Sequence, residues 1–486
     1  MIAKRNQLFK LTSAVLACAV ISACSSDNSG VSLNSGTPSS GDADFSKFVS
    51  IGDSLTAGFA DGALYLLGQT NSYPNTLAKQ FADADGVAVD FEQPLATTDL
   101  GGFLVAGMTG ILENRLVLNT ETSSPERLAG DPTEEVIGSG LNGMTFNNLG
   151  VPSAKSFHLI APGFGDPGPG PGSFIGVSSN PFFVRFALTT TSSVVGDAAA
   201  QAPSFYTLWI GNNDVLGFAT SGGDGSDPIT DTATFDFSYD SIVVAMKMAN
   251  PAVQGVLINI PDVSTIPFFT TVPFNAVPLE DQADVDALNG AYAAYNGGLD
   301  AAVAGMAITA EEAAQRKIVF ALGQNAMVIL DETLLPIAGP GSNLRQTTAN
   351  DLVVLTASTA IQTAGGGTSV PLADADVLIP SEIQAIEVAR TAFNATIKAA
   401  ADADANLAFF DVAAVMAELQ ATGIDFGTGS VNSDFATGGA FGLDGVHPTG
   451  RGYAVVANEI IDVINATFNA NVHKVDPAQF PTIFLK

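Results

Sequence analysis

Short, continuous apolar runs rich in β-branched and aromatic residues recur along this chain and constrain its fold more than any other feature. They lie at residues 48–51, 144–147, 205–210, 256–260, 318–322 and 407–412. A strand that is apolar on both faces is typical of a parallel sheet covered by helices on both sides. The pattern therefore predicts an α/β fold with a doubly wound parallel sheet, in which functional sites collect at the carboxyl ends of the strands.

Helical stretches lie between these runs and are visible by their period. One apolar face consists of Val285, Leu288, Tyr292, Tyr295 and Leu299, and another consists of Ile383, Ile386, Phe393 and Ile397, interrupted by Arg390. Such faces are predicted to pack against the core and not to hold a cofactor.

The composition is that of a globular chain with a large core, because 47% of the 486 residues are hydrophobic and only 14% are charged. We expect one folded domain at 45–486, with insertions near 99–140, 162–172 and 327–380. The formal net charge of −31 argues against nucleic acid as a partner. The oligomeric state is left open.

The first 23 residues have the features of a bacterial export signal, since basic residues precede an apolar run at 11–21 that is too short to span a bilayer. The run ends in Ile21-Ser22-Ala23-Cys24, which resembles a lipobox. We therefore predict lipidation of Cys24, followed by a flexible tether at 24–44. The resemblance implies an outer-membrane lipoprotein. Simple cleavage after Ala23 is the alternative.

The run at 48–51 leads directly into Gly52-Asp53-Ser54-Leu55-Thr56-Ala57-Gly58. A serine at a tight turn that ends a buried strand is exposed on a rigid support, as a nucleophile must be. Asp53 is predicted to structure the turn through backbone hydrogen bonds. A serine is a poor nucleophile at neutral pH, so this interpretation requires a base and a group that orients the base.

Both groups are found near the C-terminus, where Asp444 stands three residues before His447 in the segment Leu443-Asp444-Gly445-Val446-His447-Pro448. Histidine can take the serine proton and return it to the leaving group, while the carboxylate fixes the tautomer of the ring. The other two histidines, His158 and His473, lack such partners and are excluded from the site.

Two further motifs follow predicted strands and supply donors for an oxyanion hole. Asn147-Asn148-Leu149-Gly150-Val151-Pro152 offers a glycine N–H, and Gly211-Asn212-Asn213-Asp214 offers side-chain amides. Asn212 is a candidate turn residue, and Asp214 is predicted to cap a helix.

The order GDS, N-x-G, G-x-N-D and D-x-x-H-P resembles the SGNH/GDSL hydrolase family from Ser54 to His447. The resemblance implies a flavodoxin-like three-layer α/β/α sandwich and a serine esterase that needs neither metal nor other cofactor. It also implies that Ser54, His447 and Asp444 form the triad, with Ser54, Gly150 and Asn213 as oxyanion donors. The spacing from Ser54 to Gly150 is longer than in compact members.

The family resemblance implies carboxylic esters as substrates, and a lipid or another acylated small molecule is the favoured partner. Sugar O-acetylesterase and thioesterase activities use the same machinery, and a surface lipoprotein that binds glycan or lipid without turnover is a further alternative. The segment 265–274 resembles a loop near the acyl pocket of some members. We expect this segment either to act as a lid or to be packed in the core.

Overall fold

The computed structural model describes residues 35–168, 179–337 and 341–486. The predicted leader and Cys24 lie outside the described residues, as do the first part of the predicted tether and the end of the 162–172 segment.

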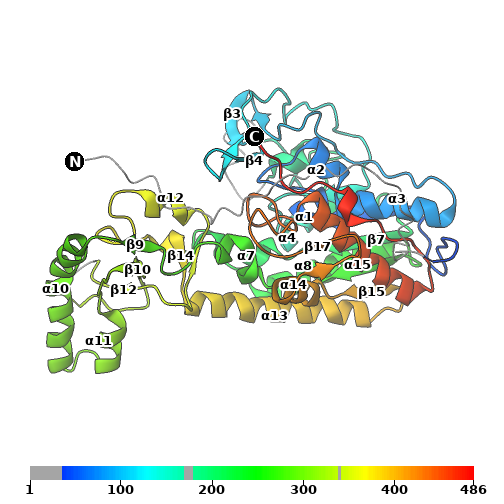
Figure 1. Ribbon diagram of the computed structural model, residues 1–486. Helices are drawn as coiled ribbons and strands as arrows, with labels where there is room; N and C mark the ends of the chain where they lie inside the picture. The colour runs from blue at the N-terminus through cyan, green and yellow to red at the C-terminus, as the bar shows by residue number, and fades with distance from the viewer. Residues whose placement is uncertain (1–34, 169–178, 338–340) are drawn as a thin grey trace.

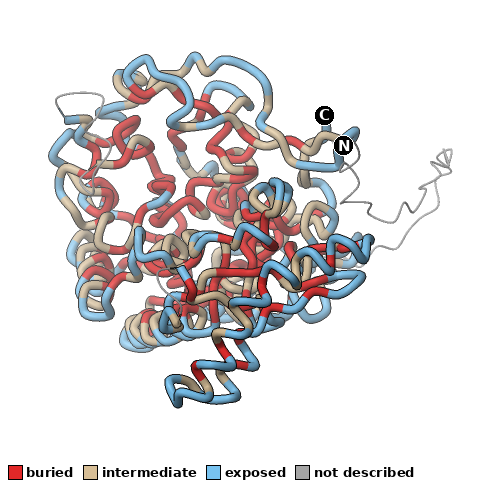
Figure 2. The backbone as a smooth tube through the Cα atoms, turned by 90° about the vertical axis from the view of Figure 1, so that its left-hand side faces the viewer, coloured by how far each residue is buried: buried red, intermediate tan, exposed pale blue. Residues whose placement is uncertain are grey.

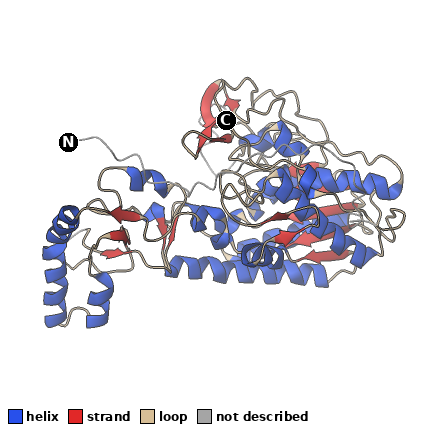
Figure 3. Cartoon of the chain, viewed as in Figure 1, coloured by secondary structure: helices blue, strands red, loops and turns tan. Residues whose placement is uncertain are grey.

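Five parallel strands form the central sheet in the order β15-β8-β7-β1-β6. They are β1 (Phe48–Gly52), β6 (Asn148–Gly150), β7 (Phe205–Trp209), β8 (Gln254–Ile258) and β15 (Leu407–Phe410) (Figure 3). Almost all of their residues are buried, as expected of a sheet with helices on both faces. The predicted α/β fold with a parallel sheet is therefore confirmed.

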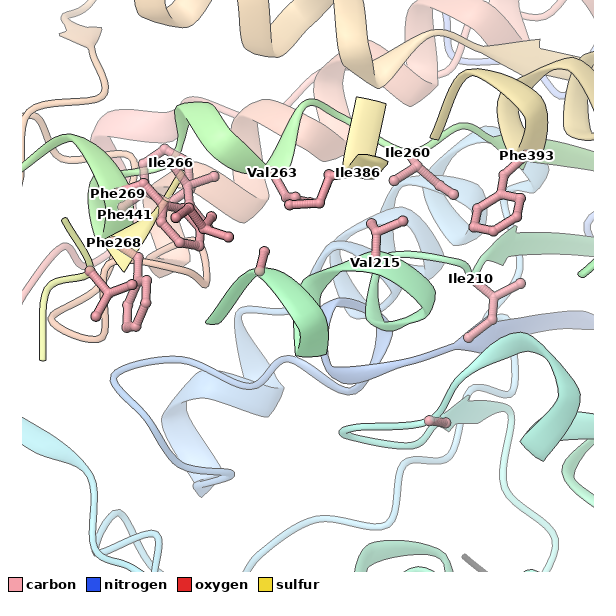
Figure 4. Close-up of a cluster of buried hydrophobic side chains, with 14 of the residues drawn as sticks. Ile210, Val215, Ile260, Val263, Ile266, Phe268, Phe269, Ile386, Phe393 and Phe441 are labelled. Atoms are coloured by element: carbon pink, nitrogen blue, oxygen red, sulfur yellow. The ribbon is translucent and has the colours of Figure 1, made fainter. Parts of the chain in front are cut away.

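Helices cover both faces of this sheet (Figure 1). On one face lie α3 (Tyr73–Asp85) and α15 (Gly450–Phe468), and on the other lie α4 (Ser156–Ile160), α6 (Val194–Ala199), α8 (Thr232–Ala249) and α13 (Pro380–Asp402). Figure 4 shows part of the hydrophobic core between the sheet and the second group of helices. There Ile210 and Ile260, which follow β7 and β8, pack near Val215 of α7 (Asn213–Thr220) and Phe393 of α13. Buried residues fill the space between these layers, and exposed residues line the outside (Figure 2).

Shorter elements connect these layers. They are the helices α1 (Ser54–Ala57), α2 (Leu66–Thr70), α5 (Pro181–Val184) and α14 (Val412–Ala421), the strands β16 (Ile424–Asp425) and β17 (Ser430–Val431), and the 3-10 turns η2 (Val263–Thr265) and η4 (Pro477–Gln479). The predicted insertion at 99–140 contains two antiparallel hairpins. They consist of β2 (Phe103–Val105) with β3 (Met108–Leu112) and β4 (Leu116–Asn119) with β5 (Ser124–Arg127).

Residues 272–379 form a second group of elements at one end of the sheet, which we call the distal lobe (Figure 1). Its helices are α10 (Gln282–Ala304), α11 (Ala310–Arg316) and α12 (Ala357–Gln362), with the 3-10 turn η3 (Asp374–Asp376). Its strands are β9 (Val277–Leu279), β10 (Gly323–Asn325), β11 (Val328–Leu330), β12 (Leu344–Gln346), β13 (Leu352–Val353) and β14 (Val377–Leu378). The segment 327–380, predicted as an insertion, is thus only part of this lobe.

The two helical faces predicted from the period are confirmed by α10 and α13. Val285, Tyr292 and Leu299 of α10 are buried, as are Ile386, Phe393 and Ile397 of α13. Arg390, which interrupts the apolar face of α13, donates to the carbonyl of Ile260 just after β8. It therefore adds to the hydrogen bond that Asn394 of the same helix donates to this carbonyl at the end of the sheet.

Two of the predicted strands differ from the structure. The run at 144–147 precedes the strand, which occupies Asn148–Gly150. The prediction of a strand at 318–322 is wrong, because Ile318 and Phe320 are buried against α10 without joining the sheet. The N–H and C=O groups of these two residues bond to the side-chain amides of Asn296 and Asn289 of α10, which replace a neighbouring strand.

Residues 35–44, the described part of the predicted tether, lie along the C-terminal end of α15. Asp42 N–H donates to the carbonyl of Phe468, and Ser39 pairs with Asn471. In the described part of the chain, no helix combines the length and apolar composition that a bilayer crossing requires.

Candidate active site

Three of the predicted site residues form a continuous hydrogen-bonded chain. His447 Nε2 lies 2.9 Å from Ser54 Oγ, and His447 Nδ1 lies 2.9 Å from Asp444 Oδ2. The side chains of His447 and Asp444 are only 14% and 12% exposed. The two ring nitrogens thus face a hydroxyl on one side and a carboxylate on the other, which is the geometry that general-base activation of a serine requires.

The site lies where the strand order reverses. Along the chain, the strands of the sheet follow one another as β1, β6, β7, β8 and β15. In the sheet, however, β1 lies between β6, the second of these strands, and β7, the third. Ser54 follows β1, and Asn212 and Asn213 follow its neighbour β7. The loops after two such strands lead to opposite faces, which leaves a crevice at the carboxyl edge where ligands bind in open α/β sheets.

The turn that carries Ser54 is fixed by residues on both of its sides. The Asp53 carboxylate accepts from Leu55 N–H and from Asn212 Nδ2, both at 2.9 Å. Gly52 is required because a Cβ there would stand 2.2 Å from the carbonyl oxygen of Trp209. Burial raises the pKa of Asp53 to about 6, although these two hydrogen bonds oppose the shift. The predicted structural role of Asp53 agrees with these contacts.

Asp444 is held by the backbone as well as by His447. Its Oδ1 accepts from the N–H groups of Val446 and His447, and its Oδ2 accepts from Gly62 N–H at 2.7 Å. Burial alone would raise the pKa of Asp444, but the charge of His447 and the hydrogen bonds outweigh it and hold this pKa below the ordinary value. Asp444 therefore stays ionised and orients the ring.

Asp61 supports the turn that contains Asp444, and the sequence motifs gave no sign of it. Asp61 Oδ1 accepts from Leu443 N–H and its Oδ2 accepts from the Tyr65 hydroxyl, both at 2.8 Å. The residue has a left-handed backbone with φ of 51° and is 1% exposed. Burial raises its pKa to about 6, and the nearby charge of Asp444 adds to the shift. The feature that marks Asp61 is a buried non-glycine residue at positive φ, which can be recognised in a structure but not in a sequence.

The predicted oxyanion donors differ in their availability. Gly150 N–H donates to Asn148 Oδ1 at 3.0 Å, and a Cβ at Gly150 would stand 2.1 Å from Ala57 N. The glycine thus allows α1 to pack on β6, and its N–H already has a partner. Over the described residues, Ser54 N–H has no hydrogen-bond partner.

No sequence motif singled out the N–H of Ser153, in the loop after β6. Ser153 is exposed, has φ of 65°, and its N–H has no partner among the described residues. Asn213 Nδ2 donates one hydrogen to the carbonyl of the next residue, Ala154, at 3.0 Å. Asn213 therefore ties the loop of Ser153 to the start of α7.

Asp214 is structural, although not as the predicted cap of its own helix. Asn212 is the N-cap of α7, and Asp214 lies in the first turn. Its carboxylate accepts from both N–H and Oγ of Ser156, at 2.8 and 2.7 Å. Asp214 thus caps the start of the neighbouring helix α4.

The segment 265–274, with its short helix α9 (Pro267–Thr270), is packed into the core. Ile266, Phe268 and Phe269 are at most 9% exposed, and Figure 4 shows them beside Phe441. Phe268 N–H donates to the carbonyl of Gly445, between Asp444 and His447. Buried packing, one of the two predicted alternatives, therefore describes this segment in the structure.

The two histidines excluded from the site have other surroundings. His158 stacks on Phe164 with ring centroids 4.8 Å apart, and burial lowers its pKa to about 4. His473 Nδ1 stands 3.9 Å from a carboxylate oxygen of Asp83.

A cluster of carboxylates that no sequence motif revealed lies where the distal lobe meets α13. Oxygens of Glu332, Asp374 and Glu382 lie within 4.8 Å of one another. Burial raises the pKa of Glu382 to about 8, and its two carboxylate neighbours add to the shift. Burial and the two neighbouring carboxylates thus favour the protonated form of Glu382.

Comparisons with protein-family models, with curated proteins and with solved structures find no match to this chain, so the functional conclusion rests on the geometry described above.

Proposed function

We propose that this protein is a serine hydrolase that cleaves carboxylic esters through Ser54, His447 and Asp444. The observation that carries the proposal is the unbroken Ser54–His447–Asp444 chain of 2.9 Å contacts at the carboxyl edge of a parallel sheet. The strand order, equivalent to 2-1-3-4-5 in chain order, is that of flavodoxin-like sheets. This order favours the finer assignment to the SGNH/GDSL fold.

In the proposed reaction Ser54 Oγ attacks the ester carbonyl while His447 Nε2 takes its proton. The oxygen of the tetrahedral intermediate becomes negative and needs donors that are free to face it. Ser54 N–H and the second hydrogen of Asn213 Nδ2 are available for this role. We propose Ser153 N–H as the third donor, because Gly150 N–H is engaged by Asn148.

Collapse of the intermediate breaks the bond to the alcohol, which leaves with the proton held by His447. Water then attacks the acyl-enzyme with His447 as base and releases the acid and free Ser54. Asp444 stays ionised throughout and stabilises the imidazolium form. The favoured substrates are lipid esters or shorter acyl esters. A lipid anchor on Cys24 would hold the enzyme at the outer membrane.

Hydrolysis of p-nitrophenyl butyrate by the full chain in mild detergent tests the proposal. We expect turnover that is lost in Ser54→Ala, while the far-ultraviolet circular dichroism is unchanged. Absence of turnover from a folded protein would contradict the proposal and favour a lipoprotein that binds its ligand without chemistry.

A further inference from the structure

The tight turn at 151–154 is tied to the two segments that carry Ser54 and Asn213. Its first N–H donates to the carbonyl of Gly52, two residues before Ser54. Its last carbonyl accepts from Asn213 Nδ2 at 3.0 Å. Ser153, whose N–H is the proposed third oxyanion donor, lies in the middle of this turn. The direction of that N–H depends on the type of turn.

The backbone of this turn is of type II. Ala154 N–H closes the turn by donating to the carbonyl of Val151 at 3.1 Å. The first central residue is Pro152, whose ring fixes φ at about −65°, and the second is Ser153, with φ of 65°. Among the common turns, only type II combines a negative φ at the first central residue with a positive φ at the second. Positive φ strains a serine, whereas a type I turn would give Ser153 an ordinary negative φ.

Turns of type I and type II differ in the direction of the peptide unit between their two central residues, which is rotated by roughly 180°. In a planar trans peptide the C=O and N–H groups point in opposite directions, and the described residues contain no cis peptide bond. A group that holds the carbonyl of Pro152 therefore also sets the direction of Ser153 N–H. A change to type I would turn this N–H to the opposite side.

Asn180, 28 residues after Pro152, holds this carbonyl. Its Nδ2 donates to the Pro152 carbonyl at 2.8 Å in a buried hydrogen bond. Its Oδ1 accepts from Phe182 N–H at 2.9 Å and from Phe183 N–H at 3.3 Å, at the start of α5. The amide cannot rotate by 180° without losing all three hydrogen bonds, because its oxygen faces two donors and its nitrogen faces an acceptor. The direction of the Nδ2 group is thus fixed.

We propose that Asn180 is a positioning residue of the oxyanion hole. Its amide holds the carbonyl of Pro152, keeps the strained turn in type II and so directs Ser153 N–H towards the oxyanion. The inference rests on the proposed function and adds to it the residue that orients the third donor. Asn180 acts through the peptide between Pro152 and Ser153 and is not expected to contact the substrate.

Asn180→Asp tests this role because it removes the amide hydrogens and keeps an oxygen for the two N–H groups of α5. An ionised carboxylate cannot donate to the Pro152 carbonyl and repels it. We expect kcat for p-nitrophenyl butyrate at about pH 8 to fall at least ten-fold with KM within two-fold, because the oxyanion forms only in the transition state. Affinity for butylboronic acid, which forms a tetrahedral adduct with Ser54, should fall by a similar factor.

Asn250→Asp is the matched control. Asn250 Oδ1 accepts from Ala252 N–H at 3.0 Å, and its Nδ2 donates to the carbonyl of Pro203 at 2.9 Å. The same kinds of hydrogen bond are thus present just before β8, at the amino edge of the sheet and away from the site. We expect wild-type kcat from this variant. Asn180→Ser, which keeps a capping oxygen and has no amide, is the second test variant if Asn180→Asp folds poorly.

Ser153→Gly in the Asn180→Asp background separates positioning from general damage. Glycine adopts positive φ without strain, so it should restore the type II turn and raise kcat at least three-fold above that of Asn180→Asp. A purely structural role of Asn180 predicts no such recovery. If the wild type cleaves esters and Asn180→Asp has the same kcat as Asn250→Asp, this inference is overturned and the proposed function stands. Absence of turnover by the folded wild type would overturn both.

Discussion

Asp444→Asn exchanges one carboxylate oxygen for an amide NH2 and is expected to reverse the tautomer of His447. If the NH2 takes the place of Oδ2, it opposes Gly62 N–H and donates to His447 Nδ1, whose proton must then move to Nε2. If it takes the place of Oδ1, it opposes the backbone N–H groups of both Val446 and His447.

The first orientation leaves fewer donors unpaired and is therefore favoured. Each buried donor left without a partner costs about 1–3 kcal/mol, so the tautomer that can accept the Ser54 proton is about 5 to 150 times rarer in the variant. The variant also lacks the charge that stabilises the imidazolium. Together these losses should lower kcat by about 10⁴, or about 5 kcal/mol of barrier.

Steady-state hydrolysis of p-nitrophenyl butyrate measures this loss, and KM should change little because Asp444 does not contact the substrate. Asp231→Asn is the control, since Asp231 caps α8 at the surface and should give wild-type rates. A kcat for Asp444→Asn within ten-fold of wild type would refute the assigned role of Asp444.

Three further predictions follow from the site and the carboxylate cluster. Asn213→Ala should lower kcat by about 10²–10³ with little change in KM, and an unchanged kcat would remove Asn213 from the oxyanion hole. Burial raises the pKa of Asp61 from 3.8 to about 6, so the folded state binds the extra proton and wild type should lose stability as pH rises through this interval. Asp61→Asn keeps the hydrogen bond from Leu443 N–H through its amide oxygen, and its NH2 can donate to the Tyr65 hydroxyl oxygen in place of the bond that Asp61 accepts. This variant should flatten the decline in thermal unfolding; an identical decline would contradict the assignment. Glu382→Gln should likewise flatten a decline between pH 4.5 and about 8, whereas Glu311→Gln, at an exposed site, should not.

Much of the sheet was predictable because four apolar runs are long enough to be buried on both faces. The run at 318–322 failed because only Ile318 and Phe320 are buried, and the amides of Asn289 and Asn296 replace a strand partner. Apolar content alone cannot distinguish these environments, since both remove the side chains from water. The extent of the distal lobe was likewise not visible in the local sequence pattern.

The meeting of Ser54, Asp444 and His447 could be predicted because each lies in a short motif next to a strand end or a rigid turn. That the Gly150 N–H is already hydrogen-bonded could not be predicted. Its acceptor is the side chain of a residue two positions away, and the rotamer of that side chain is set by packing. Asp61 escaped prediction because its contact with Leu443 joins segments 382 residues apart. Contacts of this kind depend on the tertiary fold and leave no local pattern.

Covalent labelling with a fluorophosphonate, followed by mass-spectrometric peptide mapping, tests most directly whether Ser54 is an activated nucleophile. We expect one phosphonyl adduct per chain on Ser54, with labelling much slower in His447→Ala and absent in Ser54→Ala. An unlabelled folded protein, or an adduct on another residue that survives Ser54→Ala, would contradict the proposed triad.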